Sequence, residues 1–163
     1  MTVGHLLFSA RGRIGRAQWW VGMIVVGVLY GLGLLVGVYV ERSSGFGIGR
    51  VVMGLWCALA LYLGYCVLAK RFHDRDERPI WALVAVVLAG LQIALDLAEA
   101  SYPLSMQLIN TVNIALLIGR AVLGIVFIVV LGCQRGTVGD NRHGPDPVPR
   151  TAPFPAPSKI ASG

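Results

Sequence analysis

Charged residues are scarce in this 163-residue sequence. Only 13% of the residues are Asp, Glu, Lys or Arg, 56% are apolar, and the mean hydropathy is +0.71. Water-soluble domains carry roughly 25% charged residues. The deficit excludes an ordinary soluble domain and indicates helices surrounded by lipid. The length predicts one domain, and four spans of about 20 residues each would use most of it.

Sequence signatures of redox, metal and nucleotide chemistry are also lacking. The three cysteines lie inside apolar segments, and they form no CxxC or Cys/His pattern. We find no P-loop, no HExxH helix and no spacing typical of a nucleophile with its base. The cysteines therefore are predicted to be buried apolar residues. The sequence predicts no metal, no cofactor and, on balance, no enzyme.

Long apolar runs alternate with short polar segments. This pattern predicts an all-α, polytopic membrane protein with four transmembrane helices. We expect one four-helix domain over residues 1–146, a short interfacial helix within residues 1–18, and a Pro-rich disordered tail over 147–163. Two GxxxG pairs in the first span indicate close helix packing, within the chain rather than between copies. The expected spans are residues 19–40, 51–69, 80 to about 98, and 114–133.

Lys and Arg are distributed unevenly among the polar segments. The lead before residue 19, the segment after residue 69 and the tail hold eleven of them, whereas the segment between the first two spans holds Arg42 and Arg50. Cytoplasmic loops carry such an excess. Both termini are therefore expected in the cytoplasm. The same asymmetry explains the net charge of +6 without any nucleic-acid partner.

Two charged residues interrupt the last two apolar runs. Starting the fourth span after Arg120 would leave 13 residues, too few to cross, so Arg120 has to lie within it. Counted from the cytoplasmic ends, Asp96 and Arg120 both lie about 20 Å deep, at 1.5 Å per helical residue. We predict that they pair near the outer leaflet. The alternative is that Arg120 reaches outward to the lipid headgroups.

The densest charge lies in Lys70–Trp81, which separates two charge-free runs and is predicted to be a loop. The orientation places three polar segments on one face: GRIGRAQWW (12–20), RFHDR (71–75) and GDNRHGPDP (139–147). Gly144 is expected to supply a positive φ in a turn, and Asn141 to cap a helix end.

Together the three segments resemble the bacterial inner-membrane family called domain of unknown function 805. Its members show a GRxxRxxFW-like start, an RRxHD-like loop and a closing GxNxxGxxP-like segment, and here Trp19 stands at the Phe position. The family loop after His-Asp tends to be small and polar, whereas this chain has Asp76-Glu77-Arg78-Pro79. The resemblance implies a bacterial inner-membrane location and a cytoplasmic motif cap, without an established activity. The cap residues are Gly12, Trp20, His73, Asp74, Asn141 and Gly144.

Three functions compete for these residues. The favoured hypothesis is a bundle, without enzyme activity, whose basic cap binds membrane lipids or a partner. Anionic headgroups would contact Arg13, Arg16, Lys70 and Arg71. A second copy or another membrane protein stays open as a partner. A small transporter or channel subunit would use the intramembrane charges. A lipid-modifying enzyme would use His73, Asp74 and His143.

Overall fold

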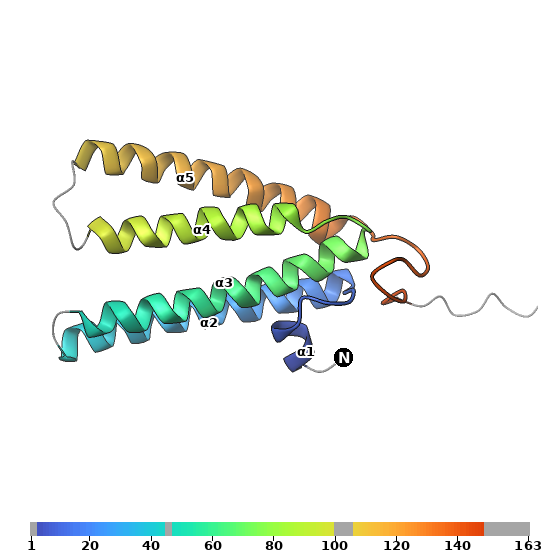
Figure 1. Ribbon diagram of the computed structural model, residues 1–163, viewed down its shortest axis with the longest axis horizontal. Helices are drawn as coiled ribbons and strands as arrows, with labels where there is room; N and C mark the ends of the chain where they lie inside the picture. The colour runs from blue at the N-terminus through green and yellow to red at the C-terminus, as the bar shows by residue number, and fades with distance from the viewer. Residues whose placement is uncertain (1–2, 45–46, 100–105, 149–163) are drawn as a thin grey trace, which may run out of the picture.

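The computed structural model describes residues 3–44, 47–99 and 106–148, and within these ranges the chain is built from helices (Figure 1). The last long helix, α5, passes without a break into a π-helical end, η1. The all-α prediction is thereby confirmed, including a short helix near the N-terminus. The helices are α1 (Val3–Phe8), α2 (Arg16–Ser44), α3 (Ile48–Asp74), α4 (Ile80–Glu99), α5 (Met106–Phe127) and η1 (Ile128–Cys133).

Three helical stretches in the described ranges are long and apolar enough to cross a membrane. They are α2, α3 and the continuous stretch Gln107–Cys133. In α4 the apolar part, Ile80–Asp96, is shorter. A polytopic membrane protein is therefore the architecture that length and composition support.

Helices α2 and α3 pack closely because glycines on α2 receive side chains from α3. The Trp56 ring lies against Gly33 and donates a hydrogen bond to the carbonyl of Leu29 (2.7 Å). One turn further on, Gly37 faces Met53. Packing of this second GxxxG pair within the chain is thus confirmed. The first pair differs, because a Cβ atom added at Gly27 or Gly31 would meet no atom within 4 Å.

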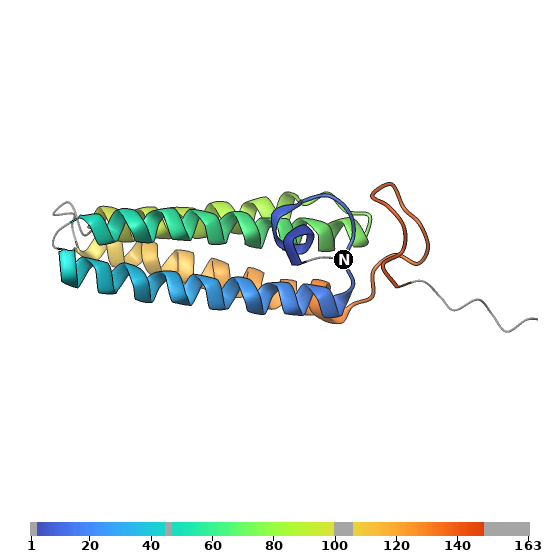
Figure 2. The same cartoon turned by 90° about the horizontal axis from the view of Figure 1, so that it is seen from below.

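The four long helices form two layers. Helices α2 and α3 lie below α4 and α5 in Figure 1 and in front of them in Figure 2. The layers converge at the end of the molecule that carries α1 and the C-terminal segment (Figure 1). The best-buried apolar cluster lies there, and Phe72 and Phe127 meet edge to face in it, 5.7 Å apart. Its other central members are Trp19, Leu63, Val67 and Leu131.

The helices extend beyond several predicted boundaries, and two of these differ the most. Lys70–Asp74 belongs to α3 instead of a loop, because the side chains of Lys70, Arg71 and Asp74 are buried against acceptors and donors of the fold. The helix therefore continues through its charges. α5 begins at Met106, earlier than residue 114, since its first polar side chains form local helical contacts such as Thr111 to the Gln107 carbonyl (2.8 Å). From residue 149 on, the predicted disordered tail lies outside the described residues.

Candidate functional site, a buried polar cap

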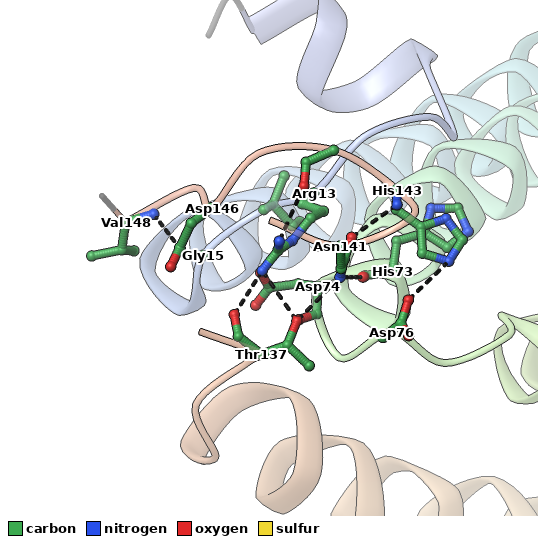
Figure 3. A network of polar contacts seen from close by, with 12 residues as sticks. Arg13, Gly15, His73, Asp74, Asp76, Thr137, Asn141, His143, Asp146 and Val148 are labelled. Atoms are coloured by element: carbon green, nitrogen blue, oxygen red, sulfur yellow. Dashed lines mark hydrogen bonds and ion pairs between the residues drawn. The ribbon is translucent and has the colours of Figure 1, made fainter. Parts of the chain in front are cut away.

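Three segments far apart in sequence meet beyond the converging helix ends (Figure 3). They are the connection before α2, the C-terminal end of α3, and residues 134–148 after η1. The hydrogen bonds that join them span 57 to 131 residues of sequence. We call this assembly the polar cap.

Arg13 is the central donor of the polar cap. Its Nε and Nη2 donate to Oδ1 of Asp74 at 3.2 and 3.0 Å. Nη1 donates to the carbonyls of Gly139 (2.7 Å) and Gly144 (3.1 Å), and Nη2 also reaches the carbonyl of Thr137 (2.7 Å). The side chain is 1% exposed. All five N–H groups of the guanidinium therefore face protein acceptors.

Arg71 fixes the end of the last helix in the same way. Its Nε donates to the carbonyl of Leu131 (2.7 Å) and its Nη2 to that of Gln134 (2.6 Å), where the helix has no further N–H groups to offer. Nη1 bonds the carbonyl of Ile14 (3.3 Å) and pairs with Oδ2 of Asp74. One buried side chain thus ties α3 to η1 and to the chain before α2.

Asp74 is shared between the two arginines. Each carboxylate oxygen accepts from a different guanidinium, and the side chain is 4% exposed. Its backbone carbonyl accepts from both the N–H and the hydroxyl of Thr137, at 2.8 Å each. A carboxylate between two buried cations is electrostatically favourable at low dielectric, provided the remaining N–H groups are bonded. Here all five N–H groups of Arg13 and four of those of Arg71 have acceptors.

Lys70 holds α1 against α3. Its Nζ, fully buried, donates to the carbonyl of His5 (2.7 Å) and to that of Leu6. Leu6 and Leu7 are themselves buried in the apolar cluster. The short helix is therefore anchored by one charge and two leucines.

The end of α3 is closed by a backbone motif. Asp76 N–H donates to the His73 carbonyl (3.1 Å) and Glu77 N–H to the Phe72 carbonyl (3.0 Å), with Asp76 at φ 58°. This Schellman arrangement usually has glycine at the left-handed position. Here Asp76 occupies it and pairs with Arg142 (2.9 Å).

Asn141 and Gly144 form the turn that the sequence predicts. They exchange backbone hydrogen bonds of 3.2 and 3.1 Å, and Gly144 has φ 132°. The Asn141 amide donates to the carbonyl of His73 at the end of α3 (2.9 Å). Both predictions for this pair, a positive φ and a helix-end cap, are confirmed.

The two cap histidines stack on one another. The rings of His73 and His143 are nearly parallel, with centroids 4.0 Å apart, and Asp76 lies 4.0 Å from Nε2 of His143 (Figure 3). Asp74 does not join them, because both its oxygens are held by arginines. In the part of the chain that the structure describes, no group of three or more His, Cys, Asp or Glu side chains is arranged to bind a metal.

A polar pocket of about 220 Å³ opens beside this network. Arg16 is exposed and donates to the carbonyl of Cys133 (2.9 Å). Asp146 lies at the rim, where the N–H groups of Val148 (2.9 Å) and Gly139 (3.0 Å) bond its carboxylate and lower the pKa of Asp146. We call this the arginine pocket. Its charged lining residues are Arg16, Arg71, Arg135, Asp74 and Asp146.

Comparison with known proteins assigns the family. The model of the family described as protein of unknown function (DUF805) matches residues 7–145. The chain belongs to the DUF805 family.

Two relatives of this DUF805 chain come from Escherichia coli strain K12. Inner membrane protein YhaH is 28% identical over 140 residues, covering 84% of this chain and 85% of YhaH. Uncharacterized protein YiiR is 29% identical over 153 residues, covering 90% of each chain. No solved structure matches the chain significantly. With its helices of membrane-spanning length, this DUF805 protein is a multi-pass inner-membrane protein, as predicted.

The motif residues of the family occupy distinct places in this DUF805 cap. Gly12 turns the chain with φ 94°, and Trp20 is half-exposed and meets Trp19 edge to face, 4.9 Å away. Of the four residues predicted to contact a headgroup, Arg16 alone is exposed, whereas Arg13, Lys70 and Arg71 are buried with protein acceptors.

Sequence reasoning missed three residues of the cap. Thr137 bonds Arg13 and Asp74, Arg135 lines the arginine pocket, and Gly136 lies so close to the Asp74 carboxylate that a Cβ there would overlap it. Their position in the sequence could have indicated a role in the cap, since they lie just before the closing motif of DUF805.

The two charges that were predicted to lie within the membrane line neighbouring cavities of this DUF805 protein. Arg120 lines one, Asp96 lines the next, and Tyr30 lines both. Asp96 accepts a hydrogen bond from Gln92 (2.9 Å), which also donates to Asn113 (3.0 Å). Among the described side chains no direct ion pair joins Asp96 to Arg120, so their pairing stays a prediction.

Proposed function

We propose that this DUF805 protein is a four-span, non-enzymatic inner-membrane protein whose arginine pocket binds the anionic headgroup of a cytoplasmic-leaflet lipid. The observation that carries the proposal is the charge of the pocket and its network. Four arginines, at positions 13, 16, 71 and 135, face two aspartates, at 74 and 146, which leaves two positive charges. Phosphate groups are bound by such arginines.

The position of the pocket also supports a lipid ligand. It lies between the first residues of α2 and the segment that follows η1, and the positive end of the α2 dipole adds to its field. Trp20, 41% exposed, stands one turn from Arg16, as aromatic side chains do at a membrane interface. The buried Arg13 and Arg71 hold the segments that line the arginine pocket in place, whereas Arg16 and Arg135 supply its exposed positive charge.

The four-span topology is supported by helix length and by charge. α4 has 20 residues, about 30 Å of helix, which matches the hydrocarbon core. The excess of Lys and Arg lies at the cap end. Native Cys133 is exposed there, so the prediction of a buried cysteine was wrong at this position, whereas Cys57 and Cys66 are buried as predicted. A membrane-impermeant maleimide should therefore label Cys133 in inverted vesicles, and labelling from the outside of intact spheroplasts would refute the orientation.

Two alternatives are less well supported. A transporter needs a polar path along the bundle, but the packed cluster around Trp19, Val67 and Leu131 lies between the intramembrane cavities and the cap. A lipid-modifying enzyme needs His73, Asp74 and His143 to act on one group. Asp74 instead has its carboxylate bound between Arg13 and Arg71.

Lipid titration followed by native mass spectrometry tests the headgroup proposal. The double variant Arg16→Gln, Arg135→Gln should weaken phosphatidylglycerol binding by about thirtyfold, since each basic residue contributes about 1 kcal/mol. Phosphatidylcholine binding should not change.

The matched control is Arg11→Gln with Arg78→Gln. It removes the same charge from the same end of the molecule, outside the residues that line the pocket. Equal weakening in both double variants would show non-specific attraction, and unchanged binding in the first would refute the pocket.

A further inference from the structure

A second cavity lies among the spans, far from the polar cap. It has a volume of about 320 Å³, is open on one side, and is lined by residues of α2, α3 and α4, with one residue from α5. Liquid water occupies about 30 Å³ per molecule, so the space has the size of about ten waters. We call it the acyl cavity. Small residues create it, chiefly Gly27, Ala60, Gly64, Ala85 and Ala89.

The acyl cavity is apolar along its length and charged at one end. Met23 and Leu68 line the end near the cap, while Tyr30 and Ile93 line the other, about 10 Å away along the helices. Among the described residues that line it, Arg120 alone is charged. It enters from α5, about 20 Å from the cytoplasmic end of that helix, and so stands at the outer end of the cavity.

The charge of Arg120 needs an anion. A cation within a span is costly unless it is paired or reaches the headgroups. The structure gives Arg120 no hydrogen bond or ion pair among the described side chains. Asp96 lines the neighbouring cavity together with Arg50, and it accepts a hydrogen bond from Gln92. The surrounding solvent is lipid, and an anionic phospholipid carries both a phosphate, which could pair with Arg120, and an apolar acyl chain.

We propose that one acyl chain of an outer-leaflet anionic phospholipid occupies the acyl cavity while its phosphate pairs with Arg120. An outer-leaflet lipid has the required orientation, because its headgroup lies at the outer surface and its acyl chain points toward the membrane centre. The cavity runs in that direction, from Arg120 and Tyr30 to Met23. This site is separate from the arginine pocket, which faces the cytoplasmic leaflet.

Two glycines on the same helix supply a matched pair for the test. A Cβ atom at Gly27 or at Gly31 would meet no atom within 4 Å, so both positions have open space where a new side chain begins. Gly27 lines the acyl cavity, whereas Gly31 lines none of the described cavities. In the Arg16→Gln, Arg135→Gln background, which lacks the cap site, Gly27→Leu should fill the cavity and lower phosphatidylglycerol occupancy by about tenfold in native mass spectrometry, and Gly31→Leu should leave it unchanged. Equal occupancy in the two variants would overturn the proposal.

The charge is tested separately, in the Arg16→Gln, Arg135→Gln background that removes the cap site. There Arg120→Gln should lower the occupancy of phosphatidylglycerol about tenfold and leave that of phosphatidylcholine unchanged, with Arg42→Gln as the charge control. If phosphatidylcholine binds as well as phosphatidylglycerol before the substitution, no anion is recognised and the proposal fails. Displacement of the phospholipid by oleate would also overturn it, since the occupant would then be a single-chain amphiphile.

Discussion

The polar cap and the membrane half of the bundle are held together by different forces. In the cap, buried charges bond to one another and to backbone carbonyls, and the apolar cluster packs against them from the side of the bundle. In the membrane half, contacts come from glycines that admit Trp56 and Met53, and cavities remain between the helices. Lipid tails are as apolar as the side chains, so burial alone gives the spans little reason to associate.

The difference indicates where the fold is specified. The cap joins α1, α2, α3 and η1 through directional bonds, each of which requires a particular donor side chain and an acceptor at a fixed position. α5 meets α2 through η1 at this end and diverges toward the other (Figure 1). We therefore interpret the cap as the clamp of the bundle and the membrane half as the part with room for lipid.

The largest expected effect comes from removing the shared carboxylate. Asp74→Ala leaves Arg13 and Arg71 buried, 1% exposed and without their anion. Breaking a buried pair in this way costs about 3–5 kcal/mol. The thermal unfolding midpoint in detergent should fall by many degrees, and α1 and the C-terminal segment should become sensitive to protease.

The control for this variant is Asp76→Asn, two residues further on. Asp76 also pairs with an arginine, but its side chain is 44% exposed, so the loss should stay below about 1 kcal/mol. Similar unfolding midpoints for the two variants would contradict the clamp.

The sequence predicted the helices and which polar segments share one end, because apolar run length and the positive-inside asymmetry are properties of residue type. It did not predict that Lys70 and Arg71 are buried. Their acceptors are the carbonyls of His5, Leu131 and Gln134, and every residue carries a carbonyl. Residue type therefore indicated a solvated loop, while backbone geometry produced a helix whose charges are bonded within the protein.

The start of α5 was missed for a related reason. Asn and Gln near its beginning are typical of a loop, yet Gln92 of α4 donates to Asn113 across the two helices (3.0 Å). A polar side chain inside a bundle is stable when a neighbouring helix supplies its partner. That partner is 21 residues away in sequence, and no local pattern reveals it.

The smaller expected effect tests how closely the cap is packed relative to the membrane half. Gly136 has no room for a methyl group, because a Cβ would overlap the Asp74 carboxylate, whereas a Cβ at Gly119 in α5 meets no atom within 4 Å. Gly136→Ala should destabilise the protein by about 1–3 kcal/mol, as overpacking does. Gly119→Ala should stabilise it by up to about 1 kcal/mol through helix propensity. If the two substitutions shift the unfolding midpoint in opposite directions, the cap is more closely packed than the membrane half of the bundle. A Gly136→Ala protein that melts like the unmodified chain would show that the segment after η1 moves away from Asp74 without loss, and that the clamp ends at Arg71.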